Sequence, residues 1–287
     1  MIKYFFNIAD LDSNQLRSLL DLDVSADVLK NKNIGLIFEK PSTRTRLSFK
    51  VGINNLGGNS IDLNFNELNI SRYESYEDTF KTMDCYLDGI IYRTSNHDNL
   101  IEASKYFKKP IINALSDISH PCQIISDLLT LKDHFGSLKC NILWMGDMNN
   151  VCFSLVEAVN SIKEMTLTIC SPKSISSSKE WKINPNISII DNLNEIDLKL
   201  VDCVMTDVFI SMNDEDNKEK ESLLRSFQVD SNLMSNTNPD SVFMHCLPAK
   251  VGYEVSEKVF RSSKSIVWKQ AYNRLIAQNK LLHYIFR

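Results

Sequence analysis

Short apolar runs alternate with longer stretches of helical spacing along nearly the whole of this 287-residue chain. Strands joined by intervening helices pair in parallel, so this alternation is typical of an α/β fold. Strands are expected at 34–38, 87–92, 110–113, 141–146, 166–170, 187–190, 201–206 and 241–246. Helices are expected at 13–21, 43–56, 75–84, 97–106, 120–135, 151–163, 215–226, 254–261 and 269–285.

The length of the chain suffices for one large or two medium domains. A boundary is expected near 135–140, where a long helical stretch ends at Phe135-Gly136-Ser137 and a new strand begins at Cys140. We therefore predict two domains, 1–135 and 136–265, each with a central parallel sheet flanked by helices. The last helical stretch, 266–287, has no strand after it and is expected to pack back on the first domain. Segment 171–186 is polar and is interpreted as a loop.

Composition excludes several classes of function. The formal net charge of -4 argues against a partner that is a nucleic acid or a membrane surface. No apolar run reaches membrane-spanning length, and the apolar start meets Asn7 and Asp10 too soon for a signal peptide. The seven cysteines show no metal-type spacing and are expected to be reduced thiols. A cytoplasmic protein is predicted.

The segment Ser42-Thr43-Arg44-Thr45-Arg46 directly follows the apolar run 34–38 and opens a helical stretch. The free N–H groups and the positive dipole end of such a helix attract anions. Hydroxyls and guanidinium forks add hydrogen bonds that suit phosphate oxygens. The Gly-x-x-x-x-Gly-Lys pattern of nucleotide-binding loops is absent, so a compact phosphorylated ligand is predicted.

Polar side chains follow six of the expected strands, and in parallel sheets ligands bind outside the carboxyl ends of the strands. One shared site explains this better than six unrelated caps. The segments concerned are Ser42–Arg46, Arg93-Thr94, His120–Gln123, Gly146–Asn150, Asp207 with Ser211-Met212, and His245–Pro248.

Four of these segments resemble the signatures of ornithine carbamoyltransferases: Ser42–Arg46, His120-Pro121-x-Gln123, Asp207 through Ser211-Met212, and His245-Cys246-Leu247-Pro248. The resemblance covers nearly the whole chain in the same order. The phosphate-side motifs are shared with aspartate carbamoyltransferases, which typically have His-Pro-Leu-Pro-Arg where this chain has His-Cys-Leu-Pro-Ala. The resemblance therefore implies transfer of a carbamoyl group from carbamoyl phosphate to the δ-amine of ornithine, giving citrulline.

The resemblance also implies a role for each matching residue. Arg93, His120 and Cys246 are the expected catalytic residues. Carbamoyl phosphate is expected to bind Ser42, Thr43, Arg44, Thr45, Arg93, His120, Gln123, Cys246, Leu247 and Arg274. Ornithine is expected to bind Asn150, Asp207, Ser211 and Met212. No metal and no cofactor are expected, because arginines supply the cationic charge.

The chain departs from the family pattern at three positions. Phe209 replaces a Trp, Asn213 replaces a Gly, and Lys50 replaces a Glu next to the phosphate motif. Glu74 is expected either to pair with Arg44 or to be solvated. These changes leave the expected chemical groups intact but bear on the choice of acceptor.

Several readings remain open at this stage. The acceptor could be another amine, or the chain could bind carbamoyl phosphate without turnover. A dinucleotide-binding dehydrogenase is a poor fit, because no Gly-x-Gly-x-x-Gly follows the first strong strand. The family resemblance implies a homotrimer, and both arginine biosynthesis and citrulline breakdown fit the sequence.

Overall fold

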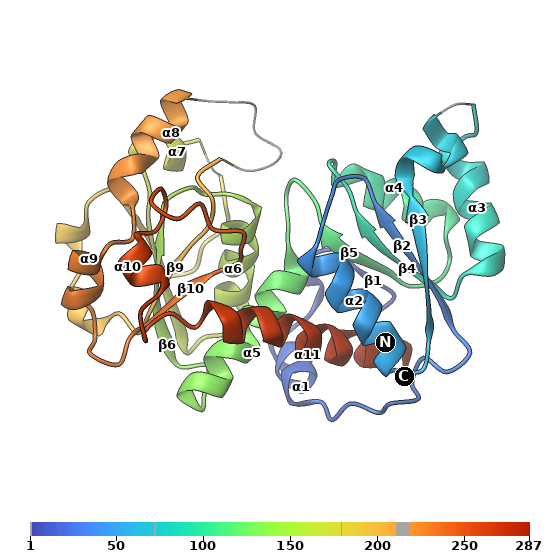
Figure 1. Cartoon of the computed structure of the whole chain (residues 1–287), viewed down its shortest axis with the longest axis horizontal. Coiled ribbons are helices and arrows are strands. Elements are labelled where there is room, and N and C mark those ends of the chain that lie inside the picture. The colour runs from blue at the N-terminus through green and yellow to red at the C-terminus, as the bar shows by residue number, and fades with distance from the viewer. Residues whose placement is uncertain (1, 72, 179, 211–217) are drawn as a thin grey trace. The chain divides into compact units, whose positions relative to one another are not determined.

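The computed structural model describes residues 2–71, 73–178, 180–210 and 218–287. The chain forms two compact units, the first made of residues 1–126 and 273–287 and the second of residues 127–272. Each unit has its own five-stranded sheet with helices around it (Figure 1). The fold is thus α/β with two domains, as the alternating pattern predicts. The division falls within α5 (Pro121–Phe135) and α11 (Val267–Phe286) rather than at residues 135 and 265.

The sheet of unit 1 is parallel throughout, with the strand order β1-β5-β4-β2-β3. After β3 the chain returns to the other side of β2, so the order of the strands reverses between β2 and β4. Its strands are β1 (Tyr4–Phe5), β2 (Asn33–Phe38), β3 (Asn59–Asn64), β4 (Gly89–Arg93) and β5 (Ile111–Leu115). Its helices are α1 (Ser13–Asp21), α2 (Arg44–Asn55), α3 (Tyr76–Tyr86) and α4 (Asp98–Tyr106), with parts of α5 and α11.

The sheet of unit 2 is also parallel, with the order β10-β9-β6-β7-β8, and its strand order reverses between β6 and β9. Its strands are β6 (Cys140–Met145), β7 (Met165–Cys170), β8 (Ile187–Ile190), β9 (Cys203–Thr206) and β10 (Val242–His245). Its helices are α6 (Asn150–Ser161), α7 (Lys173–Ser176), α8 (Lys218–Leu224), α9 (Ser231–Asn236) and α10 (Glu257–Phe260), with the remainder of α5 and α11.

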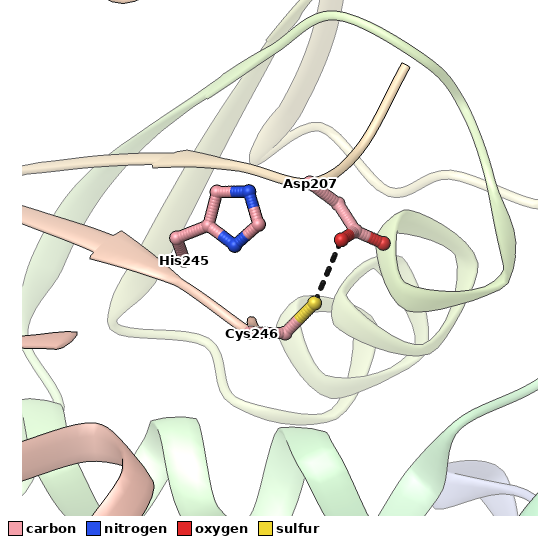
Figure 2. A group of neighbouring side chains, drawn as sticks. All are labelled: Asp207, His245 and Cys246. Carbon is pink, nitrogen blue, oxygen red and sulfur yellow. Dashed lines mark hydrogen bonds between the residues drawn. The ribbon is translucent and has the colours of Figure 1, made fainter. Parts of the chain in front are cut away.

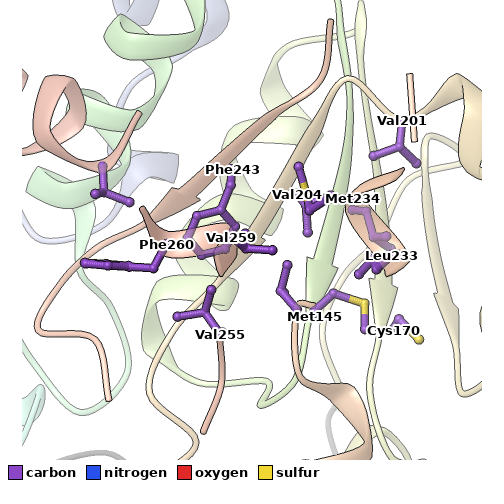
Figure 3. Close-up of a cluster of buried hydrophobic side chains, with 13 residues drawn as sticks. Met145, Cys170, Val201, Val204, Leu233, Met234, Phe243, Val255, Val259 and Phe260 are labelled. Carbon is purple, nitrogen blue, oxygen red and sulfur yellow. The ribbon is translucent and has the colours of Figure 1, made fainter. Parts of the chain in front are cut away.

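Each sheet has a buried core that fixes the ends of its strands. In unit 1, Phe80 of α3 packs with Ile37 of β2 and Tyr92 of β4. In unit 2, Met145, Val204 and Phe243 come from three neighbouring strands and meet in one cluster (Figure 3). Burial of a large apolar side chain contributes about 1.5–3 kcal/mol, so these clusters hold the strand ends firmly in register.

Among the described residues, all eight expected strands and nine expected helices occur, most of them with shifted ends. The sequence did not predict the strands β1 and β3, at the two edges of the sheet of unit 1, the helices α7 and α9, or several short 3-10 helices. Segment 171–186, interpreted as a loop, contains α7, a single turn after Pro172. Strand β3 is mostly exposed and polar, so it lacks the apolar run that marks a buried strand.

Asp12 caps α1, because its side chain accepts the Gln15 N–H at 2.8 Å. All seven cysteines are free thiols, as predicted, and five of them are buried. Within the part of the chain that the structure describes, no helix is both long and apolar enough to span a bilayer.

Candidate active site

The carboxyl ends of β2 and β4, where the strand order of unit 1 reverses, bring the first predicted residues together. Arg93 is the last residue of β4 and pairs in register with Phe38, the last residue of β2. From there its Nη1 donates to the Ser42 hydroxyl at 3.2 Å. Reversal points are where parallel sheets bind ligands, because the loops diverge there and leave an opening.

A second arginine joins this group from the C-terminal helix. Arg274 on α11 donates from Nη1 to Gln123 Oε1 at 2.5 Å and from Nη2 to Thr45 Oγ1 at 3.0 Å. All three side chains are almost fully buried. Residues from α2, α5 and α11, far apart in sequence, thus share one hydrogen-bonded cluster.

The cluster concentrates positive charge in a buried setting. Burial, with Arg274 and Arg44 close by, lowers the pKa of Arg93 to about 10. Burial and the same kind of charge, from Arg274 and Arg93, hold the pKa of His120 well below its ordinary value. The positive charges of these arginines repel one another, and an anion bound between them would relieve that repulsion. His120 is therefore neutral at physiological pH, a form in which its imidazole can still donate one hydrogen bond.

The N-terminus of α2 adds to this site. Thr43 is the N-cap residue, and no side-chain hydrogen bond caps the helix. A helix start of this kind presents N–H groups and a positive dipole end. The guanidinium of Arg46 lies 4.8 Å from the centre of the Phe38 ring, which joins α2 to the end of β2.

In unit 2 the second group of predicted residues lies where the strand order reverses between β6 and β9. Asp207 follows β9, and its carboxylate accepts the Cys246 thiol at 2.8 Å on Oδ1 (Figure 2). Its Oδ2 accepts the Asn149 amide at 2.7 Å. The Asn149 oxygen also caps α6 by accepting the N–H groups of Val151 and Cys152. Asn150, which is expected to bind ornithine, is the first residue of α6.

Behind Cys246, His245 of the predicted segment His245–Pro248 contacts Glu254, a residue that the sequence analysis did not predict to matter. The Nδ1 atom of His245 accepts the Leu247 N–H at 2.9 Å, so its Nε2 carries the proton that faces Glu254 Oε1 at 3.2 Å. Leu247 has φ 56°, a left-handed backbone that is uncommon for a non-glycine residue. The sequence gives no indication that Glu254 contacts His245. The two residues are nine positions apart, and the segment between them is an irregular loop without a regular spacing.

The departures from the family pattern have local explanations. Phe209 is buried against Gly146, whose φ of 108° and close ring contact suit only glycine. Lys50 pairs with Asp62 of β3. The expected pair between Glu74 and Arg44 is not formed between these described residues, since the Glu74 carboxylate accepts the Thr79 hydroxyl at 2.6 Å. Ser211, Met212 and Asn213 lie outside the described residues.

Asp207, His245 and Cys246 each have one potential metal-ligand atom, and these atoms lie within 4.8 Å of one another. The lone pair of His245 Nδ1 is occupied by the Leu247 N–H, and its Nε2 faces Glu254. A metal would have to break one of these bonds, so the arrangement suits hydrogen bonding better than coordination.

Comparison with known proteins matches both units. Residues 3–133 match the carbamoyl-P binding domain of aspartate/ornithine carbamoyltransferases, and residues 138–285 match the Asp/Orn binding domain. The chain belongs to the aspartate/ornithine carbamoyltransferase family.

Relatives in this family resemble the chain over almost its whole length. An ornithine carbamoyltransferase of Methanosphaera stadtmanae is 39% identical, with 96% of each chain covered. One of Methanococcus vannielii is 42% identical, covering 91% of this chain and 89% of the relative. The crystal structure of ornithine carbamoyltransferase from Thermus thermophilus has a TM-score of 0.89 at 30% identity, with both chains fully covered. That of the anabolic enzyme from Campylobacter jejuni has a TM-score of 0.88 at 32% identity, with 99% of each chain covered.

Proposed function

We propose that the chain is an ornithine carbamoyltransferase, which transfers the carbamoyl group of carbamoyl phosphate to the δ-amine of L-ornithine. The observation that carries the choice of acceptor is the contact between the Cys246 thiol and the Asp207 carboxylate, 2.8 Å apart. The carboxylate suits the α-ammonium cation of ornithine, and the neighbouring thiol suits its nucleophilic δ-amine. The relatives named above, all ornithine carbamoyltransferases, support the same choice.

Unit 1 supplies the groups for carbamoyl phosphate. Arg93 bridges the phosphate and the carbonyl oxygen, and neutral His120 donates to that oxygen as negative charge develops on it. Gln123 accepts from the carbamoyl NH₂, and Arg274 supplies further cationic charge. The phosphate itself is held by Ser42, Thr43, Arg44 and Thr45. The support for this assignment is the buried cluster of guanidiniums and hydroxyls, whose charges favour an anion.

Unit 2 supplies the groups for ornithine. Asp207 and Ser211 bind the α-ammonium, Asn150 binds the α-carboxylate, and Met212 contributes backbone contacts. Cys246 faces the δ-amine and orients it, and the carbonyl groups of Cys246 and Leu247 receive the carbamoyl NH₂. Because the Cys246 thiol already donates to Asp207, the carboxylate sets the direction of the sulfur.

The uncharged δ-nitrogen attacks the carbonyl carbon and forms the new carbon–nitrogen bond, while the bond from that carbon to the bridging phosphate oxygen breaks. The nitrogen loses one proton, which the departing phosphate takes up. Charge moves from the carbonyl oxygen to the departing phosphate, so positioned cations and hydrogen-bond donors are the main source of catalysis.

The test is citrulline formation by the purified protein with carbamoyl phosphate and ornithine. Aspartate, putrescine and N-acylated ornithines are assayed in parallel. We expect turnover with ornithine and at most weak turnover with the others. Turnover with only another amine would overturn the choice of acceptor. Binding of carbamoyl phosphate without turnover on any amine would overturn the proposed activity and leave a non-catalytic binding protein.

The family resemblance supports two further parts of the proposal, that the active form is a homotrimer and that it acts in the cytoplasm. The likeness to the anabolic enzyme from Campylobacter jejuni supports a third, that the citrulline serves arginine biosynthesis. Light scattering on the purified protein tests the trimer. Both directions of the reaction use the same groups, so rates measured in each direction with phosphate and citrulline or with carbamoyl phosphate and ornithine test the assignment to biosynthesis.

A further inference from the structure

Glu39, the residue that follows β2, accepts several hydrogen bonds next to the residues proposed to bind carbamoyl phosphate. Its Oε1 accepts the Tyr92 hydroxyl at 2.7 Å and the Asn99 amide at 3.3 Å. Its Oε2 accepts the backbone N–H of Ser95 at 2.8 Å and the Ser95 hydroxyl at 2.9 Å. Both carboxylate oxygens are therefore fully used, without a salt bridge to any described residue.

These bonds hold the chain on both sides of Arg93. Tyr92 precedes Arg93 and Ser95 comes two residues after it, while the backbone N–H of Glu39 donates to the Arg93 carbonyl at 3.0 Å. Successive side chains on a strand point to opposite faces, so Tyr92 faces Glu39 and Arg93 faces the site. One carboxylate thus fixes the backbone from which the Arg93 guanidinium projects.

The groups around Tyr92 restrict its movement and so keep its bond to Glu39 in place. The Tyr92 hydroxyl gives its proton to Glu39, so Tyr76 on α3 donates to the Tyr92 oxygen, at 2.6 Å. Tyr92 is fully buried. The pairing of β4 with β5 skips Ala114 between Tyr92 and Arg93, so the extra residue lies on β5, while the pairing of β4 with β2 stays regular through Arg93. Burial tends to raise the pKa of Glu39, but the bonds from Ser95 and Tyr92 outweigh it and keep the pKa below its ordinary value.

We propose that Glu39 is a positioning residue that acts through Arg93: it fixes the segment Tyr92–Ser95 so that the guanidinium lies beside Ser42. This rests on the proposed function, in which Arg93 contacts carbamoyl phosphate. A displacement of the order of 1 Å at such a group is costly, because the stabilising charge no longer meets the developing one. Glu39 itself faces the opposite side and takes no part in the chemistry.

The decisive variant is Glu39→Gln. An amide keeps the volume and one acceptor oxygen, but its NH₂ cannot accept the two bonds from Ser95. We expect kcat/KM for carbamoyl phosphate to fall about 10-fold, with the KM for ornithine within about twofold of the original. Ser95→Ala removes one bond to Glu39, and Tyr92→Phe removes one bond to Glu39 together with the bond from Tyr76. Each variant keeps the other bonds to Glu39 and is expected to cause a smaller loss of the same kind. Glu77→Gln, which breaks only an exposed pair with Lys81, is the matched control and is expected to leave activity unchanged.

A double-mutant cycle with Arg93→Lys separates positioning from general stability. If Glu39 acts through Arg93, Glu39→Gln adds less than about twofold in the Arg93→Lys background. The proposal is overturned if Glu39→Gln lowers kcat/KM as much in the Arg93→Lys background as in the wild type. It is also overturned if Glu39→Gln alone has wild-type kinetics. The Kd of carbamoyl phosphate, measured by calorimetry for the same four proteins, gives a second double-mutant cycle that does not depend on turnover. If the protein makes no citrulline at all, the proposed function fails, while the binding cycle still decides the role of Glu39.

Discussion

At the scale of single residues, Asp207 illustrates how one side chain serves two neighbours. Its two oxygens accept from Cys246 and Asn149, so it sets the direction of a thiol and of a helix cap together. The negative charge is what an α-ammonium group requires. Replacement by asparagine keeps the shape but loses the charge and points an NH₂ group at a neighbouring donor.

We expect Asp207→Asn to raise the KM for ornithine about 10-fold or more, because a hydrogen bond to a charged group contributes about 1.5–3 kcal/mol. The KM for carbamoyl phosphate is expected to change little. Steady-state kinetics with each substrate varied in turn checks this. Asp240→Asn, at an exposed carboxylate of the same unit, is the control. An unchanged KM for ornithine in Asp207→Asn would contradict the assigned role.

His120 predicts a dependence of stability on pH. Burial and the nearby Arg274 and Arg93 hold its pKa well below 6.5. The unfolded state therefore binds the proton more readily, and stability falls as the pH drops below that value, by up to about 1.4 kcal/mol per pH unit. We expect the urea midpoint to fall from about pH 7 to about pH 5, and to fall less steeply in His120→Gln. His97, whose pKa is also lowered by burial, leaves part of the slope in the variant. Equal slopes would refute this account.

At the scale of elements, the loop after β10 depends on a buried carboxylate. Glu254 accepts from the His245 ring and from the Lys250 backbone N–H, and His245 in turn accepts the N–H of Leu247. This chain of bonds holds Leu247 in its left-handed conformation next to Cys246. Residues in such conformations persist only where the surroundings fix them.

Glu254→Ala is expected to lower both stability and activity. It leaves the buried Nε2–H of His245 without its acceptor, at a cost of about 1–3 kcal/mol in the free energy of unfolding. Activity is expected to fall about 10-fold or more, because the loop that carries Cys246 and Leu247 loses its support. Urea unfolding and steady-state kinetics measure the two effects. Glu257→Ala removes only an exposed pair with Arg261 and should change either quantity little. A wild-type free energy of unfolding and wild-type activity in Glu254→Ala would show that the loop keeps its conformation without Glu254.

At the scale of the whole molecule, each unit places its polar residues at the point where its strand order reverses. In unit 1 that point lies between β2 and β4, and in unit 2 it lies between β6 and β9. The same architecture thus produces an anion-binding group in one unit and an acidic, thiol-containing group in the other. What differs is the set of residues that follow the strands.

The charge concentrated in unit 1 predicts stabilisation of the protein by its ligand. Carbamoyl phosphate or inorganic phosphate relieves the repulsion among Arg44, Arg93 and Arg274, so the thermal midpoint is expected to rise on binding. At about 100 times its Kd a ligand contributes about 2.7 kcal/mol. Arg274→Ala is expected to abolish most of the rise, whereas Arg261→Ala, at an exposed guanidinium, retains it. A full rise in Arg274→Ala would show that this arginine lies outside the phosphate site.

The sequence by itself determined the α/β class, most of the strands and helices, and the two groups of polar residues at strand ends. These follow from local rules, since apolar periodicity marks buried elements and parallel strands share one edge. It did not reveal β3, whose exposed residues carry no apolar pattern. It also left open whether Glu74 pairs with Arg44 or is solvated, whereas in the structure the Glu74 carboxylate accepts the Thr79 hydroxyl.

Only the tertiary structure decided which side chains meet. Arg274 and Thr45 are 229 residues apart, yet they share a hydrogen bond, and Glu39 and Ser95 are 56 apart. Hydrogen bonds form over about 3 Å, a range that depends on how whole helices and strands pack and not on residue type alone. The sequence could therefore predict which groups bind carbamoyl phosphate, but it did not point to Glu39 and Glu254, whose hydrogen bonds reach the neighbours of Arg93 and the loop after β10.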